Sequence, residues 1–230
     1  MTNKAKQNSL NRPGASGTRN TNSRGPGRPK ASETSTRDML LGIASAEFAN
    51  LGYEGTSIRH IAQLAEISLP TLYFHFGDKR ALYEECCREV FAESQIATDS
   101  ALRGPGTASE RIHAFVVALI TSMTGESRLY RLFIRELLQS DQSILAELLE
   151  TQTMPSFELL RHTLEEALQR PVPIFEPIML YSLTTGMVQF EQFGGAIADA
   201  LQDLNDNPRR TASVIVARLF PELALRPGDS

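Results

Sequence analysis

Hydroxyl, aromatic and basic side chains are concentrated between residues 56 and 79 of this 230-residue chain. They lie on two short segments with helical periodicity. The first has apolar residues at the spacing of one helix face: Ile58, Ile61, Ala62 and Ala65. Thr56 or Ser57 can cap its start, because hydroxyl side chains accept hydrogen bonds from the first amides of a helix. We expect a short amphipathic helix here.

The second segment follows a break at Glu66-Ile67. Ser68 can cap a second helix that ends at Phe76, and Pro70 is tolerated because it falls in the first turn. Leu72 and Phe76 are expected to be buried. The remaining side chains of this helix point elsewhere: Leu69, Pro70, Thr71, Phe74 and His75. Two short helices joined by a tight turn, with a third packed across them, form a helix-turn-helix, whose second helix enters the DNA major groove. These outward groups suit thymine methyls and phosphates.

Two runs carry a resemblance to a known family: G-Y-E-G-T-S-I-R-H-I-A at 52–62 and A-E-I-S-L-P-T-L-Y-F-H-F-G-D-K-R-A-L-Y at 65–83. Together they closely resemble the tetracycline-repressor (TetR) family of transcription regulators. The resemblance is dense over about residues 34–94. Over 95–230 it rests only on length and helical content.

The resemblance implies a role for individual residues. The positions that match phosphate contacts in the family are Thr56, Ser57, Tyr73 and Lys79. The positions that match the stretch facing base edges are Ser68, Leu69, Pro70 and Thr71. His75 is expected beside the DNA backbone, and Arg59 can reach either bases or phosphates.

Two features depart from the family pattern. Glu66 stands where the family usually has glycine in the turn. Because a residue forced toward positive φ costs about 1 kcal/mol or more, the turn is expected to differ slightly. Residues 40–82 hold three basic and four acidic side chains, so they lack the expected basic patch.

The N-terminal residues offer the missing positive charge. Residues 1–32 carry seven basic side chains and no acid, whereas residues 40–230 hold 15 basic and 25 acidic ones. A basic arm on an acidic body suggests a polyanion partner, although a merely solubilising tail is the simpler interpretation. Gly27-Arg28-Pro29-Lys30 resembles half of an AT-hook. Arg28 therefore either enters the minor groove or attracts phosphates non-specifically.

The chain is predicted to be all-α. Residues 1–33 form a disordered basic arm, 34–94 a three-helix DNA-binding domain, and 95–230 a larger helical effector-binding and dimerisation domain. The first helix is expected from Arg37 to Leu51, ending at Gly52, and Asp78 is expected to cap the fourth. A capping box of Thr107 with Glu110 opens the next helix. Further helices are expected at 127–139, 143–169 with a kink at Pro155, 174–194 and 208–220.

The larger domain is rich in aromatic and methionine side chains, most of which belong in the core. The resemblance implies that some line a ligand pocket, for which we select Phe115, Met123, Tyr130, Phe133, Phe157, Met179 and Met187. Helices 174–194 and 208–220 match the family's dimer interface. Small Ser182 and Gly186 would allow close approach, and a second contact line would comprise Thr211, Ile215 and Leu219.

We therefore expect a cytoplasmic homodimer that binds a pseudo-palindromic site on double-stranded DNA. We expect it to repress transcription and to be released from its operator by a small-molecule effector. No phosphate-binding loop, dinucleotide fingerprint, metal-spaced cluster or nucleophile elbow is present in the sequence, so we expect neither an enzyme nor a cofactor or metal. No secretory signal or membrane span is expected. Cys86 and Cys87 leave an alternative: a DNA-binding regulator that responds to thiol oxidation or to a protein partner.

Overall fold

The computed structural model describes residues 31–124, 128–138, 143–191 and 206–224. Every regular element in these ranges is helical, as the sequence predicts. A π-helical turn spans Leu149–Thr153, and a short 3-10 turn spans Pro221–Leu223. The α-helices are α1 (Ala31–Gly55), α2 (Ile58–Leu64), α3 (Leu69–Phe76), α4 (Lys79–Leu102), α5 (Ala108–Met123), α6 (Arg128–Leu137), α7 (Ser143–Leu148), α8 (Met154–Leu168), α9 (Phe175–Glu191) and α12 (Pro208–Leu219).

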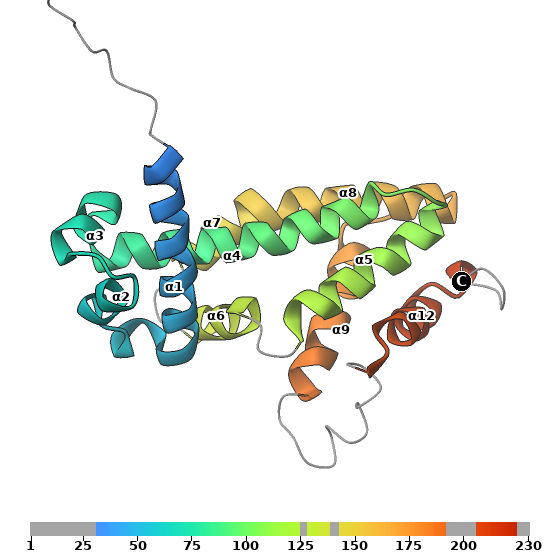
Figure 1. Cartoon of the computed structure of the whole chain (residues 1–230). Helices are drawn as coiled ribbons and strands as arrows, with labels where there is room; N and C mark the ends of the chain where they lie inside the picture. Colours follow the sequence, from blue (N-terminus) through green and yellow to red (C-terminus); the bar gives the residue numbers. More distant parts are fainter. Residues whose placement is uncertain (1–30, 125–127, 139–142, 192–205, 225–230) are drawn as a thin grey trace, which may run out of the picture.

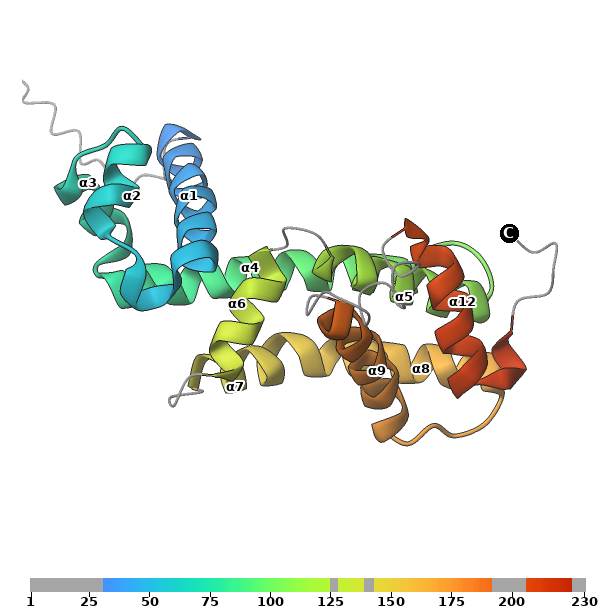
Figure 2. The same ribbon diagram turned by 90° about the horizontal axis from the view of Figure 1, so that it is seen from below.

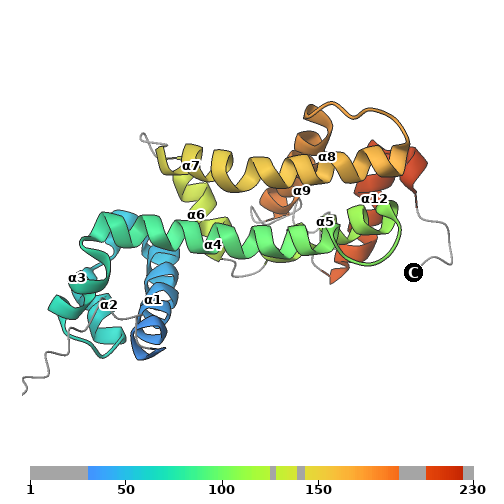
Figure 3. The same cartoon turned by 90° about the horizontal axis from the view of Figure 1, so that it is seen from above.

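Helix α4 is the long axis of the molecule. Helices α1 to α3 gather at its N-terminal end, whereas α5 and α8 run beside it and α9 and α12 lie toward its other end (Figures 1 and 2). Seen from above, α6 and α7 lie between these two groups (Figure 3). None of the helices in the described ranges has both the length and the apolar character needed to cross a membrane.

Local hydrogen bonds explain where several helices begin. Asp78 caps α4 by accepting a hydrogen bond from the Ala81 amide at 2.8 Å. At α5, Thr107 and Glu110 form the predicted reciprocal capping box. Each pair lies three residues apart along the chain, so the cap follows directly from the local sequence.

Helix α1 differs from its predicted bounds. It begins at Ala31, inside the segment expected to be disordered. The expected end at Gly52 is confirmed by a local break, where φ is 74° and ψ is 175°. Leu51, the expected last residue of this helix, lies beside this break and is 52% exposed.

One continuous apolar core joins the DNA-binding end to the rest of the chain. It includes Phe48 of α1, Phe91 and Leu102 of α4, and Leu119 of α5. The expected domain boundary between residues 94 and 95 therefore falls inside an unbroken, partly buried helix. The two predicted domains share α4 as a common structural element.

The predicted kink near Pro155 appears as the π-helical turn that precedes it. Pro155 occupies the first turn of α8, where proline is tolerated because the missing amide would have no intrahelical partner.

One expected dimer contact line on α12 is wrong. Thr211 and Ile215 are buried inside this chain, and Leu219 packs against the same core. The exposed apolar residue of α12 is instead Val214. Helical periodicity identifies an apolar face but not whether it covers its own core or a second chain.

Candidate DNA-binding surface

The turn between α2 and α3 is a Schellman motif. The Ile67 amide donates to the Ala62 carbonyl at 3.0 Å and the Glu66 amide donates to the Gln63 carbonyl at 3.1 Å. Glu66 occupies the left-handed position of this motif with φ of 55°. The turn thus keeps the geometry that favours glycine, and the side chain of Glu66 imposes a backbone cost of about 1 kcal/mol.

Helix α3 is anchored by two buried side chains, Leu72 and Phe76, as predicted. Ser68 caps it by accepting from the Thr71 amide at 3.2 Å, and the two hydroxyl groups lie 2.7 Å apart. Pro70 and Tyr73 are exposed on the opposite face. The helix therefore presents a rigid outer surface while its inner face belongs to the core.

Phe74 points outward, as the sequence predicts, although the resemblance assigned it no individual DNA contact. Its side chain is 82% exposed, and its ring packs edge-on against His75 with centroids 5.6 Å apart. A fully apolar ring in water is unfavourable, so its position beside Tyr73 signals a contact surface. The signal was available in the sequence, since the burial of Leu72 and Phe76 directs Phe74 outward.

Two of the expected DNA contacts also pack within the chain. The Thr56 hydroxyl is buried and donates to the Gly52 carbonyl at 2.7 Å, so it joins α1 to α2 instead of facing solvent. Leu69 is half-buried and packs against the core. Their roles as DNA contacts stay predictions.

The other expected contacts remain accessible to different degrees. Ser57 and Arg59 are exposed on α2, whereas His75 is half-buried. The Lys79 ammonium lies 4.6 Å from the centre of the Tyr53 ring, a cation–π contact that restrains this side chain beside α3. Arg28 lies outside the described residues.

Comparison with known proteins matches this part of the chain to a regulator family. Residues 40–86 match the model described as "Bacterial regulatory proteins, tetR family". This segment therefore carries a helix-turn-helix of the tetR type. The match covers the end of the first helix, the whole helix-turn-helix and the start of α4.

Two individual HTH-type transcriptional regulators extend the comparison. The chain is 24% identical over 151 residues to a probable HTH-type transcriptional regulator, YttP of Bacillus subtilis, covering 62% of this chain and 72% of that protein. It is 35% identical over 54 residues to the negative regulator IcaR of the Staphylococcus aureus biofilm operon icaADBC, covering 22% of this chain and 29% of that protein.

Solved structures support the fold over most of the chain. A putative TetR-family regulator from Mesorhizobium loti matches with a TM-score of 0.65 at 18% identity, covering 82% of this chain and 98% of that one. A putative regulator from Saccharomonospora viridis in complex with choline matches with a TM-score of 0.62 at 18% identity, covering 75% and 95%. At these identities the likeness shows the shared fold.

The ligand-pocket residues expected from the sequence do not gather around one cavity. Phe115 and Phe157 line a small space of about 10 Å³ beside Tyr181, whose pKa is raised to about 12 by burial. The remaining residues are dispersed, with Met123 in the core, Met179 on the surface, and three half-buried: Tyr130, Phe133 and Met187. Aromatic content alone could not separate pocket from core.

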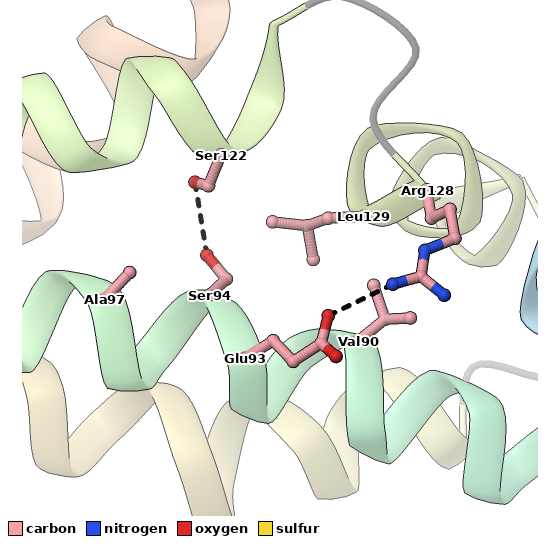
Figure 4. A pocket seen from close by; sticks show the side chains of 7 residues that line it. All are labelled: Val90, Glu93, Ser94, Ala97, Ser122, Arg128 and Leu129. Carbon is pink, nitrogen blue, oxygen red and sulfur yellow. Dashed lines mark hydrogen bonds and ion pairs between the residues drawn. The ribbon is translucent and has the colours of Figure 1, made fainter. Parts of the chain in front are cut away.

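Two larger hollows lie on either side of α4. One of about 210 Å³ lies between α4, α5 and α6, and its lining includes Glu93 and Arg128 (Figure 4). The other, of about 310 Å³, is an open groove between α4 and the start of α8, near Asp99 and Ser156. In the described residues, no group of three or more potential ligand side chains is arranged to hold a metal ion.

The two cysteines are poorly placed for redox sensing. Cys86 and Cys87 are both free and fully buried in α4. Burial raises the pKa of Cys86 far above its ordinary value and that of Cys87 to about 12. Since the thiolate is the reactive form, both groups are protonated and shielded from oxidants in this conformation.

Proposed function

We propose that this regulator is a cytoplasmic homodimeric repressor that inserts α3 of each subunit into the major groove of a pseudo-palindromic operator, and that a small molecule releases it. The observation that carries the DNA-binding role is the outer surface of α3. A capped helix held by Leu72 and Phe76 presents Pro70, Tyr73 and Phe74 outward. The description of IcaR as a negative regulator supports repression.

The accessible residues divide into two kinds of contact. Ser57, Tyr73 and Lys79 bear a hydroxyl, a phenol and an ammonium, which suit phosphate oxygens. Thr71 and Phe74 can contact the thymine methyl group, a feature of the major groove that identifies an A·T pair. Phosphate contacts position the protein on any sequence, whereas base contacts determine which sequence is preferred.

This division can be tested with an operator selected from a random DNA pool. Tyr73→Phe and Lys79→Ala should weaken binding to the operator and to a scrambled duplex by the same factor. Thr71→Ala and Phe74→Ala should lose about five- to a hundredfold on the operator and little on the scrambled duplex. Arg103→Ala, at the far end of α4, serves as the charge-removing control. Our assignment of α3 is wrong if Tyr73→Phe changes base preference while Phe74→Ala does not.

The proposed dimer interface uses the exposed face of α9. Phe175, Met179, Leu183 and Phe190 expose large apolar side chains along this helix, and Val214 does so on α12. An apolar face of this kind is expected to be covered by a second copy. Two recognition helices would then contact half-sites about 34 Å apart, or a multiple of that distance.

A charge on the α9 face tests this interface. Leu183→Glu should yield a folded monomer by light scattering that has lost most operator affinity. Ile96→Glu is the matched control, because Ile96 is 67% exposed on α4, away from α9. A dimer that survives Leu183→Glu with normal operator binding would contradict the proposed interface.

The proposed ligand response has two supports. The first is that the hollow between α4, α5 and α6 is lined by α4, the helix whose N-terminal end packs against the DNA-binding helices. The second is that a protein of the same fold has been solved with choline bound. The alternative response through thiol oxidation is disfavoured by the buried, protonated state of Cys86 and Cys87. A metabolite screen by thermal shift tests the proposal, since a ligand of the folded state raises the unfolding midpoint with its concentration. A screen without any such ligand would refute it.

A further inference from the structure

The hollow between α4, α5 and α6 combines an apolar wall with hydroxyl groups. Val90, Ala97 and Leu129 supply the wall, while Ser94 and Ser122 lie across from each other with their hydroxyl oxygens 3.3 Å apart (Figure 4). Its volume of about 210 Å³ is smaller than the roughly 300 to 1,000 Å³ typical of sites for drug-sized molecules. The space therefore suits a small ligand with a short apolar part.

Opposite charges occupy one side of this hollow. The Arg128 guanidinium lies 3.3 Å from the Glu93 carboxylate, and their side chains are 36% and 58% exposed. An ion pair this exposed contributes little to stability, so a ligand can separate its members at small cost.

The local charge balance selects among ligand classes. A second carboxylate, Glu89, lies nearby: burial and then the charge of Glu93 raise its pKa, while Arg128 lowers it. A simple anion bound to Arg128 would face two carboxylates. A simple cation bound to Glu93 would leave Arg128 without that partner. A molecule bearing both charges on neighbouring atoms satisfies Arg128 and Glu93 together.

Arg128 also reaches the DNA-binding end of the molecule. Another nitrogen of the same guanidinium donates to the Ser45 hydroxyl of α1 at 2.7 Å. Ser45 is fully buried and in turn donates to the Gly42 carbonyl at 3.1 Å. A carboxylate that engaged the guanidinium through both nitrogens would compete with Ser45 for this donor.

We infer that this hollow binds a small α-amino acid, with its carboxylate on Arg128, its ammonium on Glu93 and a short apolar side chain toward Val90, Ala97 and Leu129. Occupancy weakens the Arg128 contact with α1 and so changes the placement of α3. This inference rests on the proposed ligand response and specifies its ligand class. The effect on operator affinity is limited to the difference in ligand affinity between the two conformations.

The test uses the full chain and the standard L-amino acids at millimolar concentration. At least one with a small apolar side chain should raise the unfolding midpoint in a concentration-dependent way. For leucine, the matched probes are 4-methylpentanoate, which lacks the amine, and 3-methylbutylamine, which lacks the carboxylate; equivalent analogues apply to any other amino acid that binds. The inference is overturned if no amino acid stabilises the protein, or if either single-charge analogue binds as tightly as the parent.

Variants locate the site. Arg128→Gln and Glu93→Gln should each weaken amino-acid binding by about 10- to 100-fold, since each removes one charged partner. Because the Glu93 side chain is exposed, Glu93→Gln should fold even if Arg128→Gln does not. Arg103→Gln is the control, because Arg103 forms an exposed ion pair with Asp99 at 3.0 Å on the same helix, outside this hollow. Full binding by Glu93→Gln would refute the site.

A separate measurement distinguishes the ligand site from the regulatory proposal. Operator affinity should fall when the amino acid binds the wild type, and Ser45→Ala should reduce that response while leaving the amino-acid-induced rise in midpoint intact. If the amino acid stabilises the wild type but leaves operator affinity unchanged, the link through Arg128 and the proposed ligand response both fail, whereas the zwitterion site stands.

Discussion

Replacing Gly52 by alanine should disturb the junction between α1 and α6. Gly52 has φ of 74° and ψ of 175°, a region almost confined to glycine. A Cβ atom there would lie 2.7 Å from a terminal nitrogen of Arg135. That guanidinium donates to the carbonyls of Ala49 and Asn50, at 3.3 and 2.9 Å, and so satisfies the end of α1.

The expected loss of stability has two parts. The backbone conformation costs a non-glycine residue about 1 to 3 kcal/mol. Displacing the flexible Arg135 side chain is sterically easy but forfeits hydrogen bonds from a charged donor, for which we assign about 1 kcal/mol at this half-buried position. Gly52→Ala should therefore lower the free energy of unfolding by about 2 to 4 kcal/mol, or roughly 5 to 15 °C in midpoint.

Thermal and urea unfolding of four variants would check this reasoning. Gly55→Ala is the matched control and should be nearly neutral, because its Cβ would meet only Leu51 at 3.4 Å without a positive φ. In an Arg135→Ala background, Gly52→Ala should retain the backbone cost but lose about 1 kcal/mol of its effect. The reasoning is refuted if Gly52→Ala destabilises no more than Gly55→Ala.

Three other changes give measurable outcomes. Glu66→Gly should raise the free energy of unfolding in urea by about 0.5 to 1 kcal/mol by relieving the positive φ, whereas Glu66→Gln, which removes only the charge, should not. The Thr107 amide lowers the pKa of Glu110, so the capping box stabilises the fold at neutral pH and loses this contribution as the pH falls through the acidic range. Glu110→Gln should therefore flatten the acidic part of the curve of unfolding midpoint against pH, and an unchanged curve would contradict this role of Glu110. Deletion of residues 1–32 should reduce the slope of log operator affinity against log salt by about three, at about 0.9 per phosphate, and an unaltered slope would mean that the arm does not engage DNA.

The sequence alone predicted features that depend on neighbouring residues. Ser68 and Asp78 cap α3 and α4, and Thr107 with Glu110 opens α5, because each contact spans only three residues. The burial of Leu72 and Phe76 follows from helical periodicity in the same way. These local rules sufficed to recognise the helix-turn-helix and to orient its second helix.

Only the tertiary structure decided contacts between distant segments. Arg135 donates to the carbonyl of Asn50 in α1, 85 residues earlier, and the Thr56 hydroxyl donates to the Gly52 carbonyl of α1. Thr211 and Ile215 cover their own core, a choice that an apolar stripe leaves open. The sequence determines which faces are apolar and which ends are capped, because those interactions are local. The partner of each face and each charged side chain depends on how the helices pack, since packing brings together residues that no sequence spacing relates.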